Sequence, residues 1–326
     1  MRIVVLAGGI GGARFLRGLR KAVADGTGGG PDATTITVVG NTGDDITLFG
    51  LRVCPDLDTV MYTLGDGINT TNGWGRADET FTIREELAAH GQESLWFTLG
   101  DRDFATHIMR TAMLNEGLPL SAATESLCRR WDLGMRLLPM TDDPVETHVV
   151  VDDDGTERDL HFQEWWVRHR AALPARAIYG AGAEAAAPAP GVLEALEEAD
   201  FVLLPPSNPV VSVGTILSVP GLREAVAAKT VVGVSPIIGA APVRGMADAC
   251  LAAIGVETSA RAVAEHYGPD LLDGWLVDTV DAEVAASGVT GISVRSRPLY
   301  MTDDDATADI AREAIAMARK IVGAAR

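Results

Sequence analysis

A cluster of glycines between an apolar segment and an amphipathic segment constrains the fold of this chain more than any other feature. Residues 3–7 are short, apolar and rich in β-branched side chains, which predicts a buried strand. Residues 13–24 carry apolar side chains at helical spacing. The glycines between them are Gly8, Gly9, Gly11 and Gly12. A strand, a glycine loop and a helix in this order open a doubly wound α/β sheet.

The rest of the chain continues the alternation of short apolar segments and helical patterns. We therefore predict an α/β fold with a doubly wound, mostly parallel, Rossmann-like sheet. Strands are expected at residues 34–40, 46–53, 96–99, 201–204, 230–234, 276–279 and 292–294. Helices are expected at residues 56–64, 103–115 and 307–325, and Asp56 is expected to be the N-cap of the first of these. A hairpin is expected from 145–151 and 157–162. We interpret residues 115–185 as an inserted smaller α+β lobe, and residues 1–114 and 186–326 as the nucleotide-binding core.

The glycine loop favours a phosphate site, because glycines let the backbone approach a diphosphate and a helix N-terminus adds free N–H groups. The alternative is a tight turn with close packing of helix on strand. The loop is not a Walker A motif, since no Gly-Lys-Ser/Thr follows. An NAD-dependent oxidoreductase is disfavoured because Arg14 replaces the last glycine of the dinucleotide motif. The acid expected about 20 residues later is also missing, and Gly40 and Asn41 stand there.

Acidic and amide side chains follow the second predicted strand and the next turn. They are Asn41, Thr42, Asp44, Asp45, Asp56 and Asp58. Carboxylates from two such loops beside a phosphate site favour Mg²⁺, which binds one or two carboxylates together with substrate phosphates. The alternatives are an Asx-turn at Asn41 or Asp44 and helix caps at Asp56 or Asp58.

Further polar residues follow other predicted strands. Asp101 opens a helix after residues 96–99, in a loop that we expect to shape a substrate site. Ser207, Asn208 and Ser235 stand in proline-containing breaks where they can hydrogen-bond a base or ribose, unless the prolines only end the strands. Arg244 suits bidentate contact with phosphate. No motif for a covalent nucleophile is found.

Composition limits the class of protein. The net charge of −18 argues against nucleic-acid binding, which needs a basic face. The three cysteines have no zinc-ligand or disulfide spacing, which favours a reduced, cytoplasmic protein. No signal peptide or membrane span is expected.

These motifs, taken in order, resemble the CofD family, the 2-phospho-L-lactate transferases of coenzyme F-420 biosynthesis, with its actinobacterial FbiA branch. The resemblance covers roughly the first three quarters of the chain. The matching stretches are residues 8–14 (GGIGGAR), 41–45 (NTGDD), 55–60 (PDLDTV), 99–103 (LGDRD), 105–107 (ATH), 138–144 (LPMTDDP), 161–163 (HFQ), 206–209 (PSNP) and 235–239 (SPIIG).

The resemblance implies Mg²⁺-dependent transfer of a phospholactyl or phosphoenolpyruvyl group from a guanosine diphosphate-linked donor. The acceptor would be the ribityl hydroxyl of the deazaflavin 7,8-didemethyl-8-hydroxy-5-deazariboflavin (Fo), and GMP would leave. By similarity, Asp45 and Asp58 are expected at the metal and at the acceptor hydroxyl, as the catalytic residues. The glycine loop, Ser207, Asn208 and Ser235 would hold the guanosine diphosphate moiety.

Thr98 marks a departure from the family pattern, because some members carry Lys at this substrate-binding position. The inserted lobe is expected to contribute to the acceptor site, and a homodimer is expected. The sequence leaves the choice between the lactyl and enolpyruvyl donors open, and its Ala- and Gly-rich composition favours the enolpyruvyl donor by analogy. A nucleotide-sugar-binding regulatory protein of the same superfamily, without transfer activity, is the alternative function.

Overall fold

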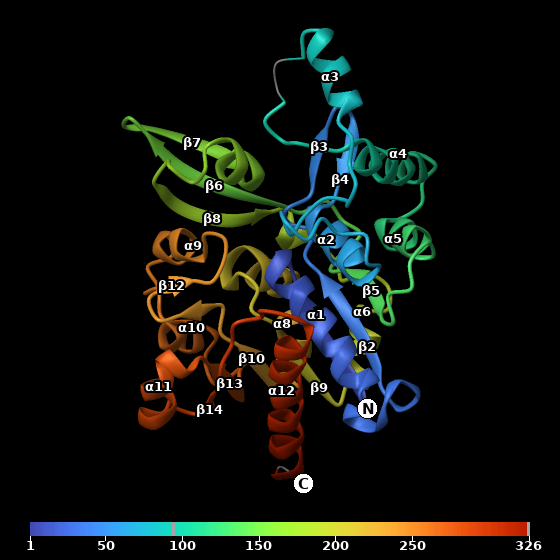
Figure 1. Ribbon diagram of the computed structural model, residues 1–326. Helices are drawn as coiled ribbons and strands as arrows, with labels where there is room; N and C mark the ends of the chain where they lie inside the picture. Colours follow the sequence, from blue (N-terminus) through green and yellow to red (C-terminus); the bar gives the residue numbers. More distant parts are fainter. Residues whose placement is uncertain (93–94, 325–326) are drawn as a thin grey trace.

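The computed structural model describes residues 1–92 and 95–324 and has a seven-stranded sheet at its centre (Figure 1). Every neighbouring pair of strands is parallel. In order across the sheet the strands are β14 (Ser293–Ser296), β13 (Gly274–Val277), β10 (Val231–Val234), β9 (Phe201–Leu204), β1 (Arg2–Ala7), β2 (Thr35–Gly40) and β5 (Arg136–Pro139). The predicted α/β fold with a doubly wound parallel sheet is confirmed.

Helices cover both faces of the sheet, because the buried strands carry apolar side chains on both sides. Along β1, Ile3 and Val5 face one hydrophobic cluster, whereas Val4 and Leu6 face another. The first cluster packs against α1 (Gly9–Ala24), α2 (Pro55–Leu64), α5 (Leu120–Cys128) and α12 (Asp304–Ala324). The second packs against α6 (Val192–Glu198), α7 (Thr215–Ser218), α8 (Leu222–Ala227), α9 (Ala247–Ala253), α10 (Ala260–Tyr267) and α11 (Ala282–Ser287).

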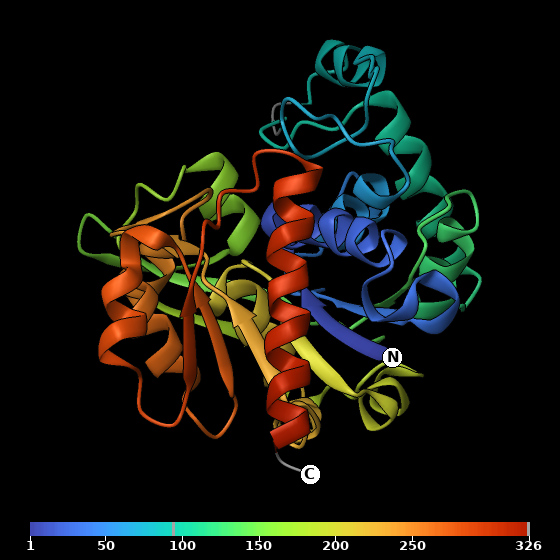
Figure 2. The ribbon, with the colours of Figure 1, turned by 60° about the horizontal axis from the view of Figure 1, so that its bottom comes forward.

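The first and last helices of the chain lie side by side on the same face. Figure 2 shows α12 lying over the middle of the sheet, where it crosses and contacts α1. Gly18 of α1 permits this contact, since a Cβ there would lie 2.4 Å from Cγ2 of Thr307. The C-terminal helix is therefore part of the core that supports the glycine loop.

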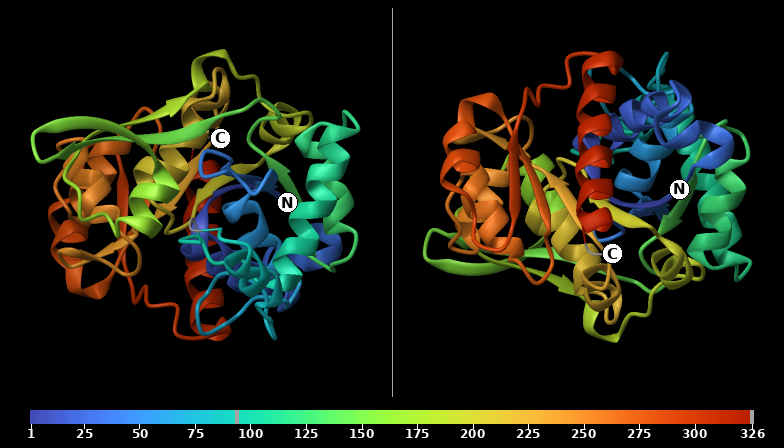
Figure 3. Two further views of the ribbon diagram at one scale, coloured as in Figure 1. Left: turned by 90° about the horizontal axis from the view of Figure 1, so that it is seen from above. Right: turned by 90° about the horizontal axis from the view of Figure 1, so that it is seen from below.

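The additional elements gather at the carboxyl ends of the central strands, which point upward in Figure 1. The hairpin of β3 (Ile46–Leu48) and β4 (Leu51–Val53) rises there beside α3 (Thr82–Ala89) and α4 (Asp101–Asn115). An antiparallel sheet follows, with the order β7 (Thr156–His161), β6 (Glu146–Asp153), β8 (Ala175–Ala181). In both views of Figure 3, the β6–β7 ribbon lies on the side opposite to α12. Two further short strands, β11 (Ile237–Ile238) and β12 (Ala241–Pro242), also pair.

Some predictions of local structure were wrong. Residues 96–99 form no strand, since their apolar side chains pack beside β4 and α4 without ladder hydrogen bonds. Residues 46–53 form a hairpin rather than one strand, with Phe49 and Gly50 at positive φ in its turn. Asp56 is not the N-cap of α2, because Pro55 opens the helix and Cys54 takes the cap position. Helix α12 begins at Asp304, ahead of the predicted residue 307.

The division of the chain into a core and an inserted lobe stays a proposal. Within the range 115–185, β6, β7 and β8 form their own sheet, as an inserted lobe requires. The same range also contains β5, which pairs with β2 at the edge of the central sheet.

All three cysteines are free. Across residues 1–92 and 95–324, no helix is both long enough and apolar enough to cross a membrane.

Candidate active site

A cavity of about 680 Å³ opens where the strand order of the sheet reverses. From β1 the chain adds β2 and β5 on one side, and later adds β9, β10, β13 and β14 on the other. Ligands of open α/β sheets bind at such a switch point, outside the carboxyl ends of the strands. The loops after β1, β9 and β10 all contribute to the cavity wall, with Gly8, Gly9, Gly11, Pro206, Ser207, Asn208, Ser235 and Pro236.

The glycine loop packs directly against the loop after β9. A Cβ on Gly11 would lie 2.3 Å from the carbonyl oxygen of Pro206, so no larger residue fits there. The Ser207 hydroxyl donates to the Gly8 carbonyl at 2.8 Å and accepts from its N–H at 3.3 Å. Gly9, with a φ of 64°, opens α1, whose first turn contains no acidic residue. The N-terminus of this helix can therefore face an anion in the cavity.

Asp44 and Asp56 form a buried pair of carboxyl groups on the cavity wall. The amide nitrogen of Asn41 donates to both, at 3.0 Å to Asp44 and 2.9 Å to Asp56. Gln163 donates to the second oxygen of Asp44 at 3.1 Å. The side-chain oxygen Oδ1 of Asn41 accepts from the Gly43 N–H at 3.0 Å, so this residue also makes the Asx-turn that the sequence allowed.

Burial raises the pKa of both carboxyl groups. The pKa of Asp56 rises to about 6, against hydrogen bonds from Asn41 and Gly9 that lower it. The pKa of Asp44 rises well above its usual value because of burial and because of the Asp56 charge beside it. Two carboxylates in this position favour a bound cation, which would relieve their mutual repulsion.

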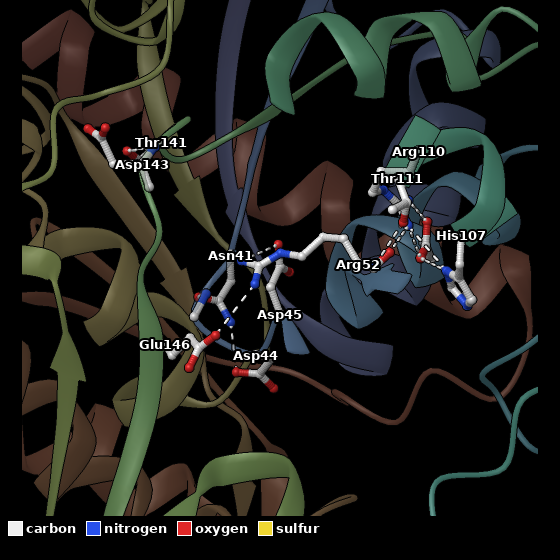
Figure 4. A network of polar contacts seen from close by, with 12 residues as sticks. Asn41, Asp44, Asp45, Arg52, His107, Arg110, Thr111, Thr141, Asp143 and Glu146 are labelled. Atoms are coloured by element: carbon white, nitrogen blue, oxygen red, sulfur yellow. Dashed lines mark hydrogen bonds and ion pairs between the residues drawn. The ribbon is translucent and has the colours of Figure 1, made fainter. Parts of the chain in front are cut away.

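Asp45 and Asp58, the predicted catalytic and metal-binding residues, are each paired with an arginine. Figure 4 shows Asp45 with its partner Arg52, and Arg110 beside His107. Asp45 lies 3.4 Å from Arg52 and is not part of the cavity wall. Burial raises the pKa of Asp45 to about 7, against the opposing charge of Arg52. Asp58 does line the cavity, and both of its oxygens accept from Arg110.

A second polar wall faces the same cavity. Tyr62 and Asp58 of α2 line it together with Asp103 and His107 of α4. Burial and the charges of Asp58 and Glu79 raise the pKa of Asp103 to about 7. Burial also lowers the pKa of His107 to about 4. Sequence reasoning assigned no role to Tyr62 or Gln163. It expected only that the loop of residues 100–103, with His107 on the helix that follows, shapes the acceptor site, although the spacing of four residues in both helices was a signal for a shared face.

The remaining predicted substrate residues divide into two groups. Those on the cavity wall are Gly8, Gly9, Gly11, Thr98, Ser207, Asn208, Ser235 and Arg244. Those behind or away from it are Gly12, Asn41, Thr42 and Asp101.

Several of these residues also hold the surrounding loops. Asp101 accepts from Thr80 and from the N–H groups at the start of α3, which lowers its pKa. Asn208 accepts from Val210 N–H at 2.9 Å, and Ser235 donates to the Ile237 carbonyl at 2.7 Å. Arg244 donates to the Asn72 carbonyl. The substrate roles of these residues stay predictions.

Within residues 1–92 and 95–324, no three His, Cys, Asp or Glu side chains are placed together to hold a metal ion. The Asp44–Asp56 pair would need oxygen ligands from a substrate to complete the coordination of Mg²⁺, which is the usual arrangement for this ion.

The sequence matches a family model described as 2-phospho-L-lactate transferase CofD over residues 3–317. A phosphoenolpyruvate transferase of Thermobifida fusca is 69% identical over 321 residues, covering 98% of this chain and 99% of that protein. A protein with the same description from Streptomyces coelicolor is 67% identical over 324 residues, with the same coverage.

Among solved structures, a member of the upf0052 family from Bacillus halodurans has a similar fold. The TM-score is 0.61 at 18% identity, and the match covers 97% of this chain and all of that one. At this identity the likeness concerns the fold alone.

Proposed function

The chain belongs to the CofD family, and we propose that it is a phosphoenolpyruvate or 2-phospholactate transferase of coenzyme F-420 biosynthesis. In this reaction a guanosine diphosphate-linked donor passes its phosphate-linked three-carbon acid to the ribityl hydroxyl of Fo and GMP leaves. The relatives described as phosphoenolpyruvate transferases favour the enolpyruvyl donor.

The observation that carries the proposal is one cavity that combines a glycine-lined helix N-terminus with a buried carboxyl pair. Transfer of a phosphate-linked group depends on positioning and on neutralising charge more than on covalent chemistry. The helix N-terminus supplies N–H groups for the diphosphate, and Asp44 and Asp56 lie beside it. A volume of about 680 Å³ is within the usual range for sites that hold small molecules.

We assign the donor to the wall formed by the glycine loop and by the loops after β9 and β10. Ser207 joins the first two loops through its hydrogen bonds with Gly8. The Gly9 N–H bonds to Asp56, so a diphosphate would use the other N–H groups of the first turn of α1, beside Asn208. Ser235 donates to and accepts from Ile237, so its remaining lone pair would accept a hydrogen bond from the ribose or base.

Mg²⁺ is the proposed cofactor. The sequence assigned it to Asp45 and Asp58, and this assignment stays a prediction. The contacts favour Asp44 and Asp56 instead, because both line the cavity and, among the residues that the structure describes, no arginine pairs with either. When bound, the cation would offset charge on the diphosphate and on the departing phosphate of GMP. Asn41 and Gln163 orient the carboxyl groups that would hold it.

The proposal is tested by mixing the purified protein with Mg²⁺, Fo and either the lactyl or the enolpyruvyl donor, and analysing the products by mass spectrometry. We expect GMP and the phosphate-linked Fo product in equal amounts, with the larger yield from the enolpyruvyl donor. Binding of the donors without any product would contradict the proposal and support the regulatory alternative. The expected homodimer is tested separately by light scattering.

A further inference from the structure

Helices α2 and α4 bring four polar side chains to one wall of the cavity. Asp58 and Tyr62 are four residues apart on α2, and Asp103 and His107 are four residues apart on α4. Residues at this spacing lie on the same face of a helix. All four line the cavity, on elements that differ from the glycine loop and the Asn41 turn.

The proton position on His107 follows from its neighbour Arg110. The Arg110 guanidinium lies 3.3 Å from Nδ1 of His107, and both of its terminal nitrogens donate to Asp58. A guanidinium can only donate, and the Asp58 oxygen lies farther from Nδ1 at 3.7 Å. We therefore assign Nδ1 as the acceptor and the ring proton to Nε2. The lowered pKa of His107 agrees with a neutral ring. Within the part of the chain that the structure describes, Nε2 has no hydrogen-bond partner, and His107 is only 2% exposed.

Asp103 supplies the complementary group. Its N–H donates to Glu79 at 2.9 Å, which fixes the backbone at the start of α4. Its Oδ1 is buried and has no partner among residues 1–92 and 95–324. The Tyr62 hydroxyl, which lines the same cavity, is also buried and makes no hydrogen bond to any residue described. Buried polar groups in this state are costly unless a ligand or water pairs them.

We propose that Tyr62, Asp103 and His107 form a subsite for the hydroxylated chain of the acceptor. An alcohol has one donor and two acceptor lone pairs, so it can donate to Asp103 and accept from both Nε2–H of His107 and the Tyr62 hydroxyl, which satisfies all three. A phosphate would be repelled by Asp58 and Asp103. A cation would meet the N–H of His107, and Asp58 is already paired with Arg110. The wall therefore selects neutral neighbouring hydroxyls, and this inference rests on the proposed function, in which the acceptor is an alcohol.

The test compares the binding of two deazaflavins to the metal-free protein by calorimetry, one with a ribityl chain and one with a methyl group in its place. Wild type should prefer the ribityl compound. Tyr62→Phe and His107→Phe should each reduce that preference by about three- to tenfold, the size of one lost hydrogen bond. His107→Gln, whose amide can present a donor near the Nε2 position, should retain more of the preference than His107→Phe. GDP affinity should not change in any variant.

Tyr267→Phe is the matched control, because Tyr267 is buried against Trp275 and is not part of the cavity wall. The inference is overturned if Tyr62→Phe and His107→Phe keep the wild-type preference, or if they weaken GDP binding equally. Thermal unfolding shows whether each variant is folded. If His107→Phe does not fold, the test rests on Tyr62→Phe, which removes a single oxygen atom. A wild type that prefers the ribityl compound but yields no GMP would contradict the proposed function and leave the subsite intact.

Discussion

At the scale of single residues, sequence reasoning found the acidic loops but not the orientation of each carboxyl group. Asp44 and Asp45 are adjacent, and only the Asx-turn at Asn41 determines that Asp44 faces the cavity whereas Asp45 faces Arg52. Arg110 lies 52 residues from its partner Asp58 and could not be paired with it from the sequence. Side-chain direction in an irregular turn and contacts between distant helices both depend on the folded structure.

Breaking the Asp58–Arg110 ion pair should lower the free energy of unfolding strongly. Both side chains are almost fully buried, so Arg110→Met leaves an unpaired carboxylate in the core. We expect a loss of about 3–5 kcal/mol in the free energy of unfolding. Arg129→Met is the matched control because Arg129 pairs with Glu125 on the surface, where the loss should be at most about 0.5 kcal/mol. Urea unfolding measures both, and equal losses would contradict the buried pair.

Asp103 should make stability depend on pH. Its pKa is about 7 in the folded protein and near 3.8 in the unfolded chain, so folding favours the protonated form. Its contribution is complete below about pH 4 and is lost as the pH rises through about 7. Between pH 5 and 8, wild type should therefore lose about 1–3 kcal/mol more stability than Asp103→Asn. Urea unfolding across this range measures the difference, and parallel curves for the two proteins would exclude the raised pKa.

At the scale of elements, apolar β-branched segments predicted the central strands well, because buried parallel strands need apolar side chains on both faces. The hairpin of β6 and β7 followed from its Asp-Gly turn. Residues 96–99 have the same apolar character, yet they pack only through side chains. Composition over four residues does not say whether a neighbouring strand is present to pair with them.

The glycine loop should tolerate no side chain at Gly11. A Cβ there meets the Pro206 backbone, which cannot move without shifting the loop after β9. We expect Gly11→Ala to cost about 1–3 kcal/mol in stability and to weaken GDP binding. Gly323→Ala is the control, since Gly323 lies in α12 with open space around it and should be neutral or slightly stabilising. Calorimetry measures GDP binding and thermal unfolding measures stability in both variants. Unchanged GDP binding in Gly11→Ala would argue against a donor site at this loop.

At the scale of the whole molecule, the sequence predicted a parallel sheet but not its strand order. That order brings β1 and β9 together although about 200 residues separate them, which creates the switch point and the cavity. Which of several similar apolar strands lie next to each other depends on how the helices pack on both faces of the sheet. The sequence of one short strand therefore does not predict its neighbours.

The C-terminal helix should be required for the fold as a whole, because α12 packs on α1 behind the glycine loop. Ala314→Glu places a charge in this contact, where the side chain is fully buried, and should cost about 3 kcal/mol or more. Ala324→Glu changes an exposed position of the same helix and should stay within about 0.5 kcal/mol of wild type. Equal unfolding midpoints for the two variants would show that α12 is dispensable.

The most direct measurement is the release of GMP from the enolpyruvyl donor in the presence of Fo, as a function of Mg²⁺ concentration, in wild type and in Asp44→Asn and Asp56→Asn. The account predicts GMP release only with Mg²⁺, and a decrease of about 100-fold in the two variants at saturating Mg²⁺. Wild-type rates in both variants, or equal release after chelation of the cation, would contradict it.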